Sequence, residues 1–255
     1  MGPGDFASST VLITGAGSGF GQAMAMRFAE HGAQVAVADI DEVAANRCVE
    51  QIVTTGGRAI AVVCDVAHGD SVREAIQNVV GQWGSFNILV NNAAVSQEPT
   101  RVGRTPEAQV DRLLAVNIKS LFYMAVHAVP VLKAAGGGCI INMASVTALR
   151  PRPGMTWYNA TKAAVVSLTQ SMAVELAADK IRVNAIAPAA GRTPMLEGML
   201  GERLEAGVKS VLSTIPLGRL CEPADVAAAA VFLASPAAGF ITGVTLAVDG
   251  GRLAG

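Results

Sequence analysis

A tyrosine and a lysine four residues apart form the most reactive pair in the sequence. Tyr158 and Lys162 lie in the segment 156–177, whose small apolar residues predict a packed helix. Side chains at positions i and i+4 share a helix face, so the phenol and the amine can converge. A positive charge about 4 Å from a phenolate contributes roughly 4 kcal/mol, or about three pKa units. The pair predicts a proton-exchanging tyrosine; a packed tyrosine beside a lysine reaching solvent is the structural alternative.

Two further polar side chains stand in positions that packing alone does not require. Ser145 ends the apolar run 139–145, which predicts a strand, and its hydroxyl can hold a substrate oxygen near Tyr158. Asn117 lies inside the helical pattern 107–134, where asparagine has poor propensity. A helix cap or turn for the serine, and a buried amide that ties neighbouring backbones for the asparagine, remain open as structural alternatives.

A glycine-rich turn joins the predicted strand 10–14 to a predicted helix at 20–31. Glycine adopts positive φ easily and lets the backbone approach a ligand closely. The unpaired N–H groups and the positive dipole at the start of the helix can bind a pyrophosphate. The spacing is TGxxxGxG rather than the commoner GxGxxG, because Phe20 stands where the last glycine would be. The setting predicts a dinucleotide site, with a purely structural turn as the alternative.

The acidic residue at the end of the second predicted strand favours one cofactor. Asp39 follows Gly19 by 20 residues, where a carboxylate can bind ribose hydroxyls and repel a 2′-phosphate. No arginine or lysine lies in 14–19 or 38–41 to bind that phosphate. We therefore favour NAD over NADP, with a helix cap as the alternative role of Asp39. Asp65 and Val66 can border the adenine, although Asp65 can equally cap a helix.

The elements that must position these residues alternate along the chain. Continuously apolar runs predict strands that are covered on both faces, and their alternation with helices implies right-handed βαβ units. We predict one α/β domain over 1–255, a doubly wound, Rossmann-type parallel sheet of about seven strands with helices on both faces. Strands are expected at 10–14, 34–39, 58–65, 87–93, 139–145, 182–188 and 244–250, and helices near 20–31, 42–55, 70–83, 107–134, 157–178 and 223–234.

One segment, 189–222, interrupts this alternation before the last helix. Long loops in compact domains often cover a binding site. We expect a substrate lid here, with an ordinary surface helical hairpin as the alternative.

Composition narrows the classes of function. The 255 residues carry a net charge of −1, which predicts no surface for nucleic acid or an anionic membrane. Four dispersed cysteines and three dispersed histidines have no disulfide or metal spacing, so we expect reduced core thiols and no metal site. The sequence has no signal-peptide pattern and no apolar run that we expect to span a bilayer, so we predict a cytoplasmic protein.

Taken together, these motifs resemble the short-chain dehydrogenase/reductase family over essentially the whole chain. The matching pieces are TGxxxGxG at 14–21, NNAA at 91–94, Asn117, Ser145 and Tyr158-x-x-x-Lys162, in the family's order and spacing. The resemblance implies four catalytic residues, which are Asn117, Ser145, Tyr158 and Lys162. It also implies that Asn117 anchors a water that links Lys162 to solvent. It also implies a homotetramer with the C-terminal strand near a subunit contact.

The resemblance extends to the cofactor. After the sixth strand the family usually has Pro-Gly and then a threonine, whereas this chain has Pro188, Ala189 and Thr193, and the extra methyl group can shift the loop. The positive nicotinamide ring of the oxidised cofactor would help Lys162 to activate Tyr158. The expected cofactor-binding residues are Gly15, Ser18, Gly19, Phe20, Gly21, Asp39, Ile40, Asp65, Val66, Asn92, Ala93, Tyr158, Lys162, Pro188 and Thr193.

The segment 147–157 should form one wall of the substrate site. Arg150 and Arg152 suggest an anionic substrate, although solvated arginines are the alternative. Trp157 and Met195 can supply apolar surface, or can belong to the core or an interface. We predict an NAD(H)-dependent oxidoreductase that interconverts a secondary alcohol and a ketone, with Tyr158 as general acid/base. A reductase of 3-oxoacyl thioesters and a non-catalytic dinucleotide sensor are the alternatives.

Overall fold

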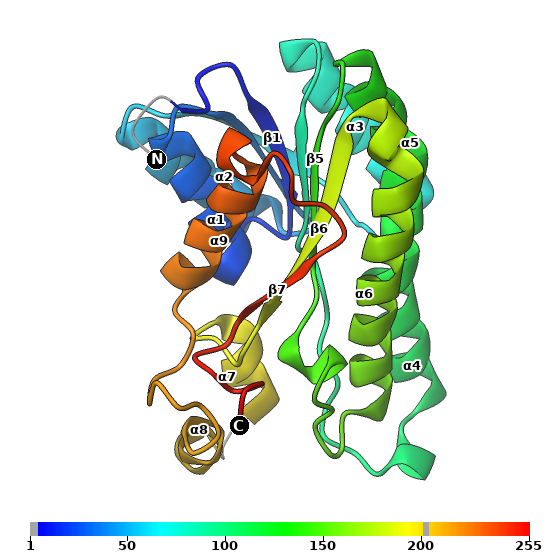
Figure 1. Ribbon diagram of the computed structural model, residues 1–255, viewed down its shortest axis with the longest axis vertical. Helices are drawn as coiled ribbons and strands as arrows, with labels where there is room; N and C mark the ends of the chain where they lie inside the picture. The colour runs from blue at the N-terminus through cyan, green and yellow to red at the C-terminus, as the bar shows by residue number, and fades with distance from the viewer. Residues whose placement is uncertain (1–4, 201–203) are drawn as a thin grey trace.

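A seven-stranded parallel sheet forms the centre of the molecule, as Figure 1 shows. The computed structural model describes residues 5–200 and 204–255. The strand order is β3-β2-β1-β4-β5-β6-β7, which confirms the predicted Rossmann-type fold class. The strands are β1 (Thr10–Thr14), β2 (Gln34–Asp39), β3 (Arg58–Val63), β4 (Ile88–Asn91), β5 (Gly138–Met143), β6 (Ile181–Pro188) and β7 (Thr245–Val248).

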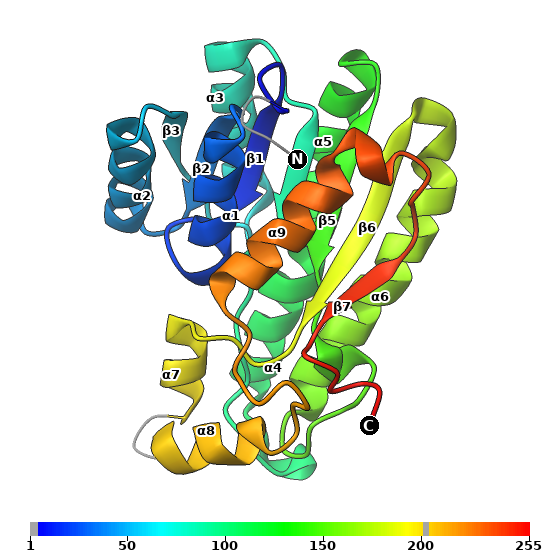
Figure 2. The ribbon, with the colours of Figure 1, turned by 60° about the vertical axis from the view of Figure 1, so that its left-hand side comes forward.

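Helices cover both faces of this sheet (Figures 1 and 2). Helices α1, α2 and α9 pack on one face, and α3, α5 and α6 pack on the other. This arrangement explains why the sequences of the central strands are continuously apolar, since neither face of these strands meets water. The helices are α1 (Gly19–Glu30), α2 (Glu42–Thr54), α3 (Gly69–Trp83), α4 (Glu107–Leu114), α5 (Ser120–Ala134), α6 (Thr156–Leu176), α7 (Pro194–Leu200), α8 (Leu204–Leu212) and α9 (Pro223–Ala234).

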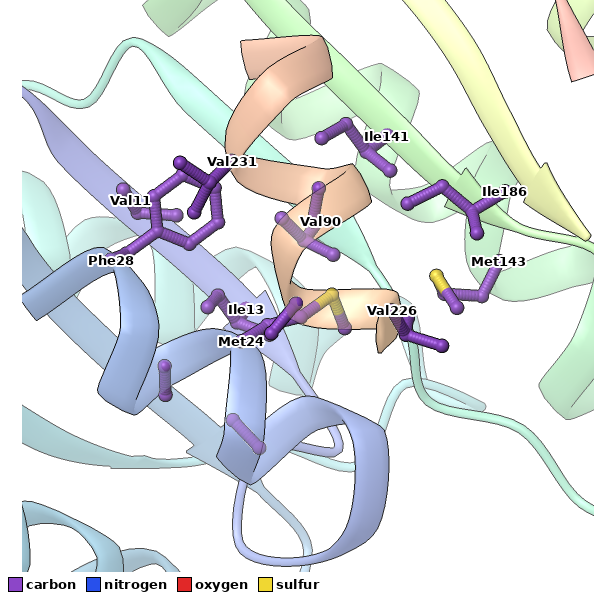
Figure 3. Close-up of a cluster of buried hydrophobic side chains, with 14 of the residues drawn as sticks. Val11, Ile13, Met24, Phe28, Val90, Ile141, Met143, Ile186, Val226 and Val231 are labelled. Atoms are coloured by element: carbon purple, nitrogen blue, oxygen red, sulfur yellow. The ribbon is translucent and has the colours of Figure 1, made fainter. Parts of the chain in front are cut away.

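Each face of the sheet carries its own hydrophobic core. On the first face, Phe28 of α1 and Val231 of α9 pack over strand residues such as Val90 (Figure 3). On the second face, Leu132 of α5 packs over strand residues such as Ile140. The two cores hold the strands in one register, so the carboxyl ends of the central strands meet at one edge of the sheet.

The point where the chain changes direction across the sheet lies between β1 and β4. Strand β1 pairs with β2 on one side and with β4 on the other. Crossover connections therefore run to opposite sides from this point, and a crevice forms outside the carboxyl ends of the two strands. The glycine-rich turn follows β1, and the NNAA segment begins within β4, so the fold brings two of the sequence motifs together.

The predicted helix at 107–134 is interrupted in the structure. A π-helical turn, Ala115–Lys119, separates α4 from α5 and contains Asn117. The whole run Glu107–Ala134 is long and apolar enough to cross a membrane by length and composition alone, contrary to the expectation from the sequence. It packs against α3, α6 and β4, and 28% of its most apolar stretch is buried.

The segment 189–222 carries α7 and α8, and its residues 201–203 lie outside the described residues. A single parallel bridge between Gly191 and Cys221 closes its base. Figure 2 shows both helices beyond the lower end of the sheet, at the same end of the molecule as the C-terminus. Leu196 and Val211 are buried in the core and also line the cleft described below, so the segment forms part of a cleft wall. Its role as a substrate lid stays a prediction.

Candidate active site

A cleft of about 370 Å³ opens at the carboxyl ends of the strands. Its walls include the glycine-rich turn, the residues after β4 and β5, and the segment after β6. Fourteen of the residues expected to bind a cofactor line this cleft. They are Gly15, Ser18, Gly19, Phe20, Asp39, Ile40, Asp65, Val66, Asn92, Ala93, Tyr158, Lys162, Pro188 and Thr193.

The glycine-rich turn is packed too closely for side chains. Gly15 and Gly19 have φ angles of 61° and 56°, in the left-handed region. A Cβ on Gly15 would lie 2.9 Å from the Cα of Ala93. Gly21 is not among the cleft-lining residues, and a Cβ there would lie 2.1 Å from the carbonyl oxygen of Gly15. Gly21 therefore lets α1 pack against the turn and contributes no surface for a ligand.

The start of α1 offers donors that the protein itself does not use. Ser18 is the N-cap residue, its backbone is extended, and its side chain makes no capping hydrogen bond. The first turn of α1 also contains no acidic side chain. The first N–H groups of a helix have no partner within the helix, so they need an acceptor from elsewhere. The turn and the helix start therefore fit the pyrophosphate of a dinucleotide.

The NNAA segment braces the turn from the neighbouring strand. The Asn92 side-chain amide donates to the carbonyl oxygens of Thr14 at 2.8 Å and Gly15 at 2.9 Å. In return, the Thr14 hydroxyl accepts the backbone N–H groups of Asn92 and Ala93, both at 3.0 Å. These bonds join the ends of β1 and β4, so Asn92 holds the glycine-rich turn as well as lining the cleft.

Asp39 faces the cleft and is fixed by backbone donors. Its two carboxylate oxygens accept the N–H groups of Gly17 at 2.8 Å and Asp41 at 3.0 Å. Asp41, not Asp39, caps α2, because its side chain accepts the N–H groups of Val43 and Ala44. Each oxygen of Asp39 keeps a further acceptor position. The carboxylate is therefore oriented and still able to bind a ligand's hydroxyl groups.

The catalytic candidates meet at the floor of the cleft. The Lys162 Nζ atom lies 5.9 Å from the centre of the Tyr158 ring and donates to the carbonyl oxygen of Met143 at 2.7 Å. The Ser145 side chain forms a hydrogen bond with Tyr158. The Ser145 hydroxyl oxygen also accepts the N–H of Thr147 at 3.2 Å, so it caps the short helical turn that follows β5. Ser145 thus has the capping role that the sequence left open, and its role in holding a substrate oxygen stays a prediction.

The pKa values of this group differ from the expectation for an isolated pair. Burial raises the pKa of Tyr158 to about 12, although the hydrogen bond with Ser145 lowers it. Burial lowers the pKa of Lys162 to about 8. From the sequence, Lys162 and the positive nicotinamide ring were expected to lower the pKa of the phenol together. In the protein without a ligand burial dominates, and the combined effect stays a prediction. With its pKa lowered to about 8, Lys162 titrates closer to neutral pH than an ordinary lysine does.

Replacing Lys162 by methionine should stabilise the fold while removing activity. A lysine whose pKa is about 8 in the folded chain and 10.5 in the unfolded chain binds fewer protons when folded between these values. Its unfavourable contribution is therefore complete below about pH 8 and disappears as the pH rises through about 10.5. We expect Lys162→Met to raise the free energy of unfolding by about 1–3 kcal/mol at pH 7, because it removes a buried charge. The gain is smaller than the pKa shift alone implies, because the carbonyl of Met143 loses its donor.

Denaturant unfolding at several pH values measures this effect. The gain in stability should shrink as the pH increases towards about 10. Lys209→Met, which changes an exposed lysine of α8, is the matched control and should show no such dependence. A net loss of stability in Lys162→Met at pH 7 would contradict the prediction.

Asn117 acts through the backbone around it. Its side chain is buried, accepts the N–H of Val95 at 2.9 Å, and donates to the Val95 carbonyl at 3.0 Å and to the Thr161 hydroxyl at 3.1 Å. It does not line the cleft. The π-helical turn at Asn117 is a distortion that often marks functional positions. Asn117 thus joins the segment after β4 to α6 beside Lys162; its water-binding role stays a prediction.

Gln97 fixes the start of α6 and was missed from the sequence. Helix α6 has Met155 at its N-cap, which has no oxygen to offer the first N–H groups. The fully buried Gln97 supplies that oxygen, accepting the N–H groups of Trp157 and Tyr158, both at 3.0 Å. Its amide nitrogen donates to the carbonyl of Gly154 at 3.2 Å. A single glutamine in an irregular segment gives no sequence signal for this role.

The expected substrate residues are only partly brought to the cleft. Arg152 and Met195 line it, whereas Trp157 and Arg150 do not. Trp157 precedes Tyr158 by one residue and is therefore rotated about 100° around the helix, which directs it elsewhere. Met155 of the expected wall and Leu196 and Val211 of the expected lid also line the cleft, although the sequence did not single them out. Arg252 lines it from outside both expected segments and was missed.

The loop after β6 accommodates its alanine. Ala189 is buried, and its N–H donates to the carbonyl of Val248 at 3.0 Å, so the extra methyl group lies in the core. Thr193 lies against the glycine-rich turn, since a Cβ on Gly19 would be 3.3 Å from its methyl carbon. The departure from the usual glycine therefore leaves Thr193 on the wall of the cleft.

Comparison with known proteins matches this arrangement. The family model described as enoyl-(acyl carrier protein) reductase, a group of short-chain dehydrogenases, matches residues 15–252. The chain belongs to the short-chain dehydrogenase/reductase family. It is 42% identical over 242 residues to the 4-formylbenzenesulfonate dehydrogenase TsaC1/TsaC2 of Comamonas testosteroni, with 94% of this chain and 96% of the relative covered.

Solved structures of the family agree. The 3-ketoacyl-(acyl-carrier-protein) reductase of Brucella melitensis complexed with NADH has a TM-score of 0.90 and 42% identity, and the match covers 96% of this chain and 98% of that one. A 7α-hydroxysteroid dehydrogenase complexed with NADH and 7-oxo glycochenodeoxycholic acid has a TM-score of 0.90 and 36% identity, with 98% of each chain covered. As a short-chain dehydrogenase/reductase, the protein is an oxidoreductase, so the alternative of a non-catalytic sensor is not supported.

Proposed function

We propose that the protein is an NAD(H)-dependent oxidoreductase that interconverts a secondary alcohol and a ketone, with Tyr158 as general acid/base. The meeting of Ser145, Tyr158 and Lys162 on the floor of the cleft is the observation that carries this proposal. Family membership alone fixes the reaction class but not the substrate, because the fold supports many specificities.

The residues of the chain have separate tasks in this reaction. When bound, a nicotinamide dinucleotide supplies the hydride acceptor or donor at the substrate carbon. In alcohol oxidation, Tyr158 takes the proton of the substrate hydroxyl, and in ketone reduction it returns that proton. Ser145 holds the substrate oxygen by a hydrogen bond. The charge of Lys162 stabilises the phenolate form of Tyr158.

Asp39 supports NAD(H) in preference to NADP(H). The residues that line the adenosine end of the cleft include two carboxylates, Asp39 and Asp65, beside Ile40 and Val66. A 2′-phosphate placed there would meet like charge, whereas the ribose hydroxyls of NAD(H) would donate to Asp39. The two neighbouring structures named as NADH complexes support the same preference.

A substrate panel tests the proposed activity. Secondary alcohols of increasing size, hydroxysteroids and hydroxy acids are incubated with NAD⁺, and the ultraviolet absorbance of the reduced nicotinamide is followed. Acetoacetyl thioesters with NADH form a second arm, because 3-oxoacyl-thioester reduction is the competing function supported by the Brucella relative. Turnover confined to the thioester arm would favour that function, and no turnover in either arm would remove the proposal.

We further propose that the protein is a homotetramer. The residues Leu114, Phe122 and Val126 are exposed apolar side chains on the α4–α5 face, and Phe240 and Val244 are exposed beside the edge strand β7. Exposed apolar side chains clustered on one face are typical of contact surfaces. Two different two-fold interfaces in one molecule generate a tetramer with D2 symmetry.

Substitution of Phe122 by aspartate should divide this tetramer. A charge in the middle of the α4–α5 face would be buried without a partner, so that interface should open while the β7 interface remains. Light scattering should therefore report four subunits for the natural protein and two for Phe122→Asp. Lys119→Glu is not a suitable control because Lys119 lies beside Leu114 and Phe122 on the same face. Arg27→Glu, on the exposed side of α1, is used instead. A monomeric natural protein would contradict the proposal.

A cytoplasmic location is also a proposal. All four cysteines, Cys48, Cys64, Cys139 and Cys221, are free and buried. Burial raises the pKa of each thiol, to about 11 for Cys48 and Cys139 and about 12 for the other two. Protonated, buried thiols suit a reducing compartment, where disulfides are rare.

A further inference from the structure

Two arginines from distant parts of the chain enter the cleft beside the catalytic floor. Arg152 precedes α6, and Arg252 follows β7, yet both line the cleft together with Ser145 and Tyr158. Arg112 of α4 also lines the cleft. Apolar side chains, Met155, Leu196 and Val211 among them, make up the rest of this wall. Charged groups in an otherwise apolar pocket usually orient a ligand.

The position of Arg252 is fixed by contacts with two other segments. Its Nη1 atom donates to the hydroxyl of Thr214 at 2.9 Å, just after α8. The neighbouring Gly250 carbonyl accepts the N–H of Leu217 at 3.1 Å. Arg150 donates to the carbonyl oxygens of Arg252 and Gly255, and therefore holds this segment instead of lining the cleft. Arg252, not Arg150, is the second arginine of the substrate wall.

The positive charge of Arg252 is not neutralised by the residues that surround it. Its Nε atom is buried and has no hydrogen-bond partner among the described residues. The carboxylate that acts on it, Asp249, already accepts the N–H groups of Gly251 at 3.0 Å and Leu253 at 2.8 Å. Burial, and then repulsion from Arg152 and Arg150, holds the pKa of Arg252 below its usual range. A buried donor on a charged group is costly unless a ligand satisfies it.

We propose that Arg252, with Arg152, binds an anionic group of the substrate, a carboxylate or a sulfonate, while the oxygen at the other end of the substrate lies against Ser145 and Tyr158. The guanidinium fork presents parallel N–H groups that match the two oxygens of such a group. The anion supplies the negative charge that the guanidinium lacks and offsets the repulsion between the arginines. This inference rests on the proposed oxidoreductase function and names its substrate class, a hydroxy or oxo acid.

Matched substrates and matched variants test the inference. Hydroxycycloalkane carboxylates are compared with their carboxamides, which have nearly the same shape and no charge. The natural protein should show a kcat/KM for the acid at least about tenfold above that for the amide, since hydrogen bonds to charged groups are worth about 1.5–3 kcal/mol. Arg252→Gln should lower the value for the acid by about 10–100-fold and change the value for the amide less than about threefold.

Two further variants separate the effect of the charge of Arg252 from the effect of its guanidinium geometry and from the loss of any arginine. Arg252→Lys keeps the charge without the fork, and should recover part of the preference for the acid. Arg192→Gln removes an exposed arginine that pairs with Glu222 at 3.1 Å and does not line the cleft, so it should keep the full preference. Turnover of the amide by each variant shows that the active site is intact.

A binding measurement that needs no turnover keeps the two proposals distinguishable. Benzoate and benzenesulfonate should raise the thermal midpoint of the NADH-loaded natural protein, whereas benzamide should not, and Arg252→Gln should abolish the shift. Equal turnover of acids and amides, or an unchanged acid preference in Arg252→Gln, would overturn the anion site while leaving the oxidoreductase function intact. Absence of turnover with every substrate, together with benzoate binding that depends on Arg252, would instead overturn the proposed function alone.

Discussion

Tyr158→Phe is expected to lower turnover by at least about 10³-fold and to leave NADH affinity within about twofold of the natural protein. The hydroxyl is the group of Tyr158 that can move a proton, and phenylalanine keeps the ring in the same place on α6. We expect cofactor binding to depend mainly on the glycine-rich turn and Asp39, which line the cleft and which this change does not touch.

The pKa of Tyr158 makes the same experiment informative about pH. Burial raises the pKa of the phenol to about 12 in the protein without a ligand, so the unprotonated form is scarce near neutral pH. A positive nicotinamide ring beside the phenol would favour the phenolate. The rise of alcohol oxidation with pH should therefore be centred well below 12 in the natural protein and should be absent in Tyr158→Phe.

The chain offers a matched control for this substitution. Tyr123 is the other of its two tyrosines. It lies in α5 and contacts Lys119 and Phe122 away from the cleft. Tyr123→Phe should keep turnover within about twofold. Natural turnover in Tyr158→Phe would exclude the phenol from the reaction, and loss of NADH binding would assign Tyr158 a structural role.

Asp39→Asn should reduce the preference for NADH over NADPH by about tenfold or more. A carboxylate about 5 Å from a 2′-phosphate charge contributes about 3 kcal/mol of repulsion at an effective dielectric constant of 20, which corresponds to about 100-fold in affinity. Asparagine keeps one acceptor oxygen, so one of the two backbone N–H groups that Asp39 now binds keeps its acceptor and the other loses it.

Fluorescence titration with the two reduced cofactors measures this preference, at a fixed ionic strength because the repulsion is screened by salt. Asp41→Asn is the matched control, since it removes a neighbouring charge and keeps a side chain that caps α2 equally well. It should change the preference by less than about threefold. Natural protein that binds NADPH as tightly as NADH would overturn the assignment of Asp39.

The parts of the fold that were predictable are those that depend on local pattern. The buried residues of β1 and β2 are apolar on both faces, so the parallel sheet was visible in the sequence. The break at Asn117 was less visible. A π-helical turn leaves the apolar pattern of 107–134 almost unchanged, and only the asparagine itself indicated a special position.

The predictable parts of the site are those that lie next to strand ends. Gly15, Asp39 and Ser145 lie at or just after the carboxyl ends of strands, so the sheet brings them together once its order is known. Arg252 and Gln97 reach the site from irregular segments, where side-chain direction depends on tertiary contacts. Trp157 was expected at the substrate site and does not line the cleft, although its neighbour Tyr158 does.

Gln97 ties the reactive end of α6 to a stretch of chain 60 residues earlier. That stretch begins with Ala93, Ala94 and Val95, which border the cofactor half of the cleft. The Gln97 side chain thus connects the segment that borders the expected dinucleotide site to the backbone that carries Tyr158. We therefore expect a change of Gln97 to act on the orientation of Tyr158, although Gln97 itself does not line the cleft.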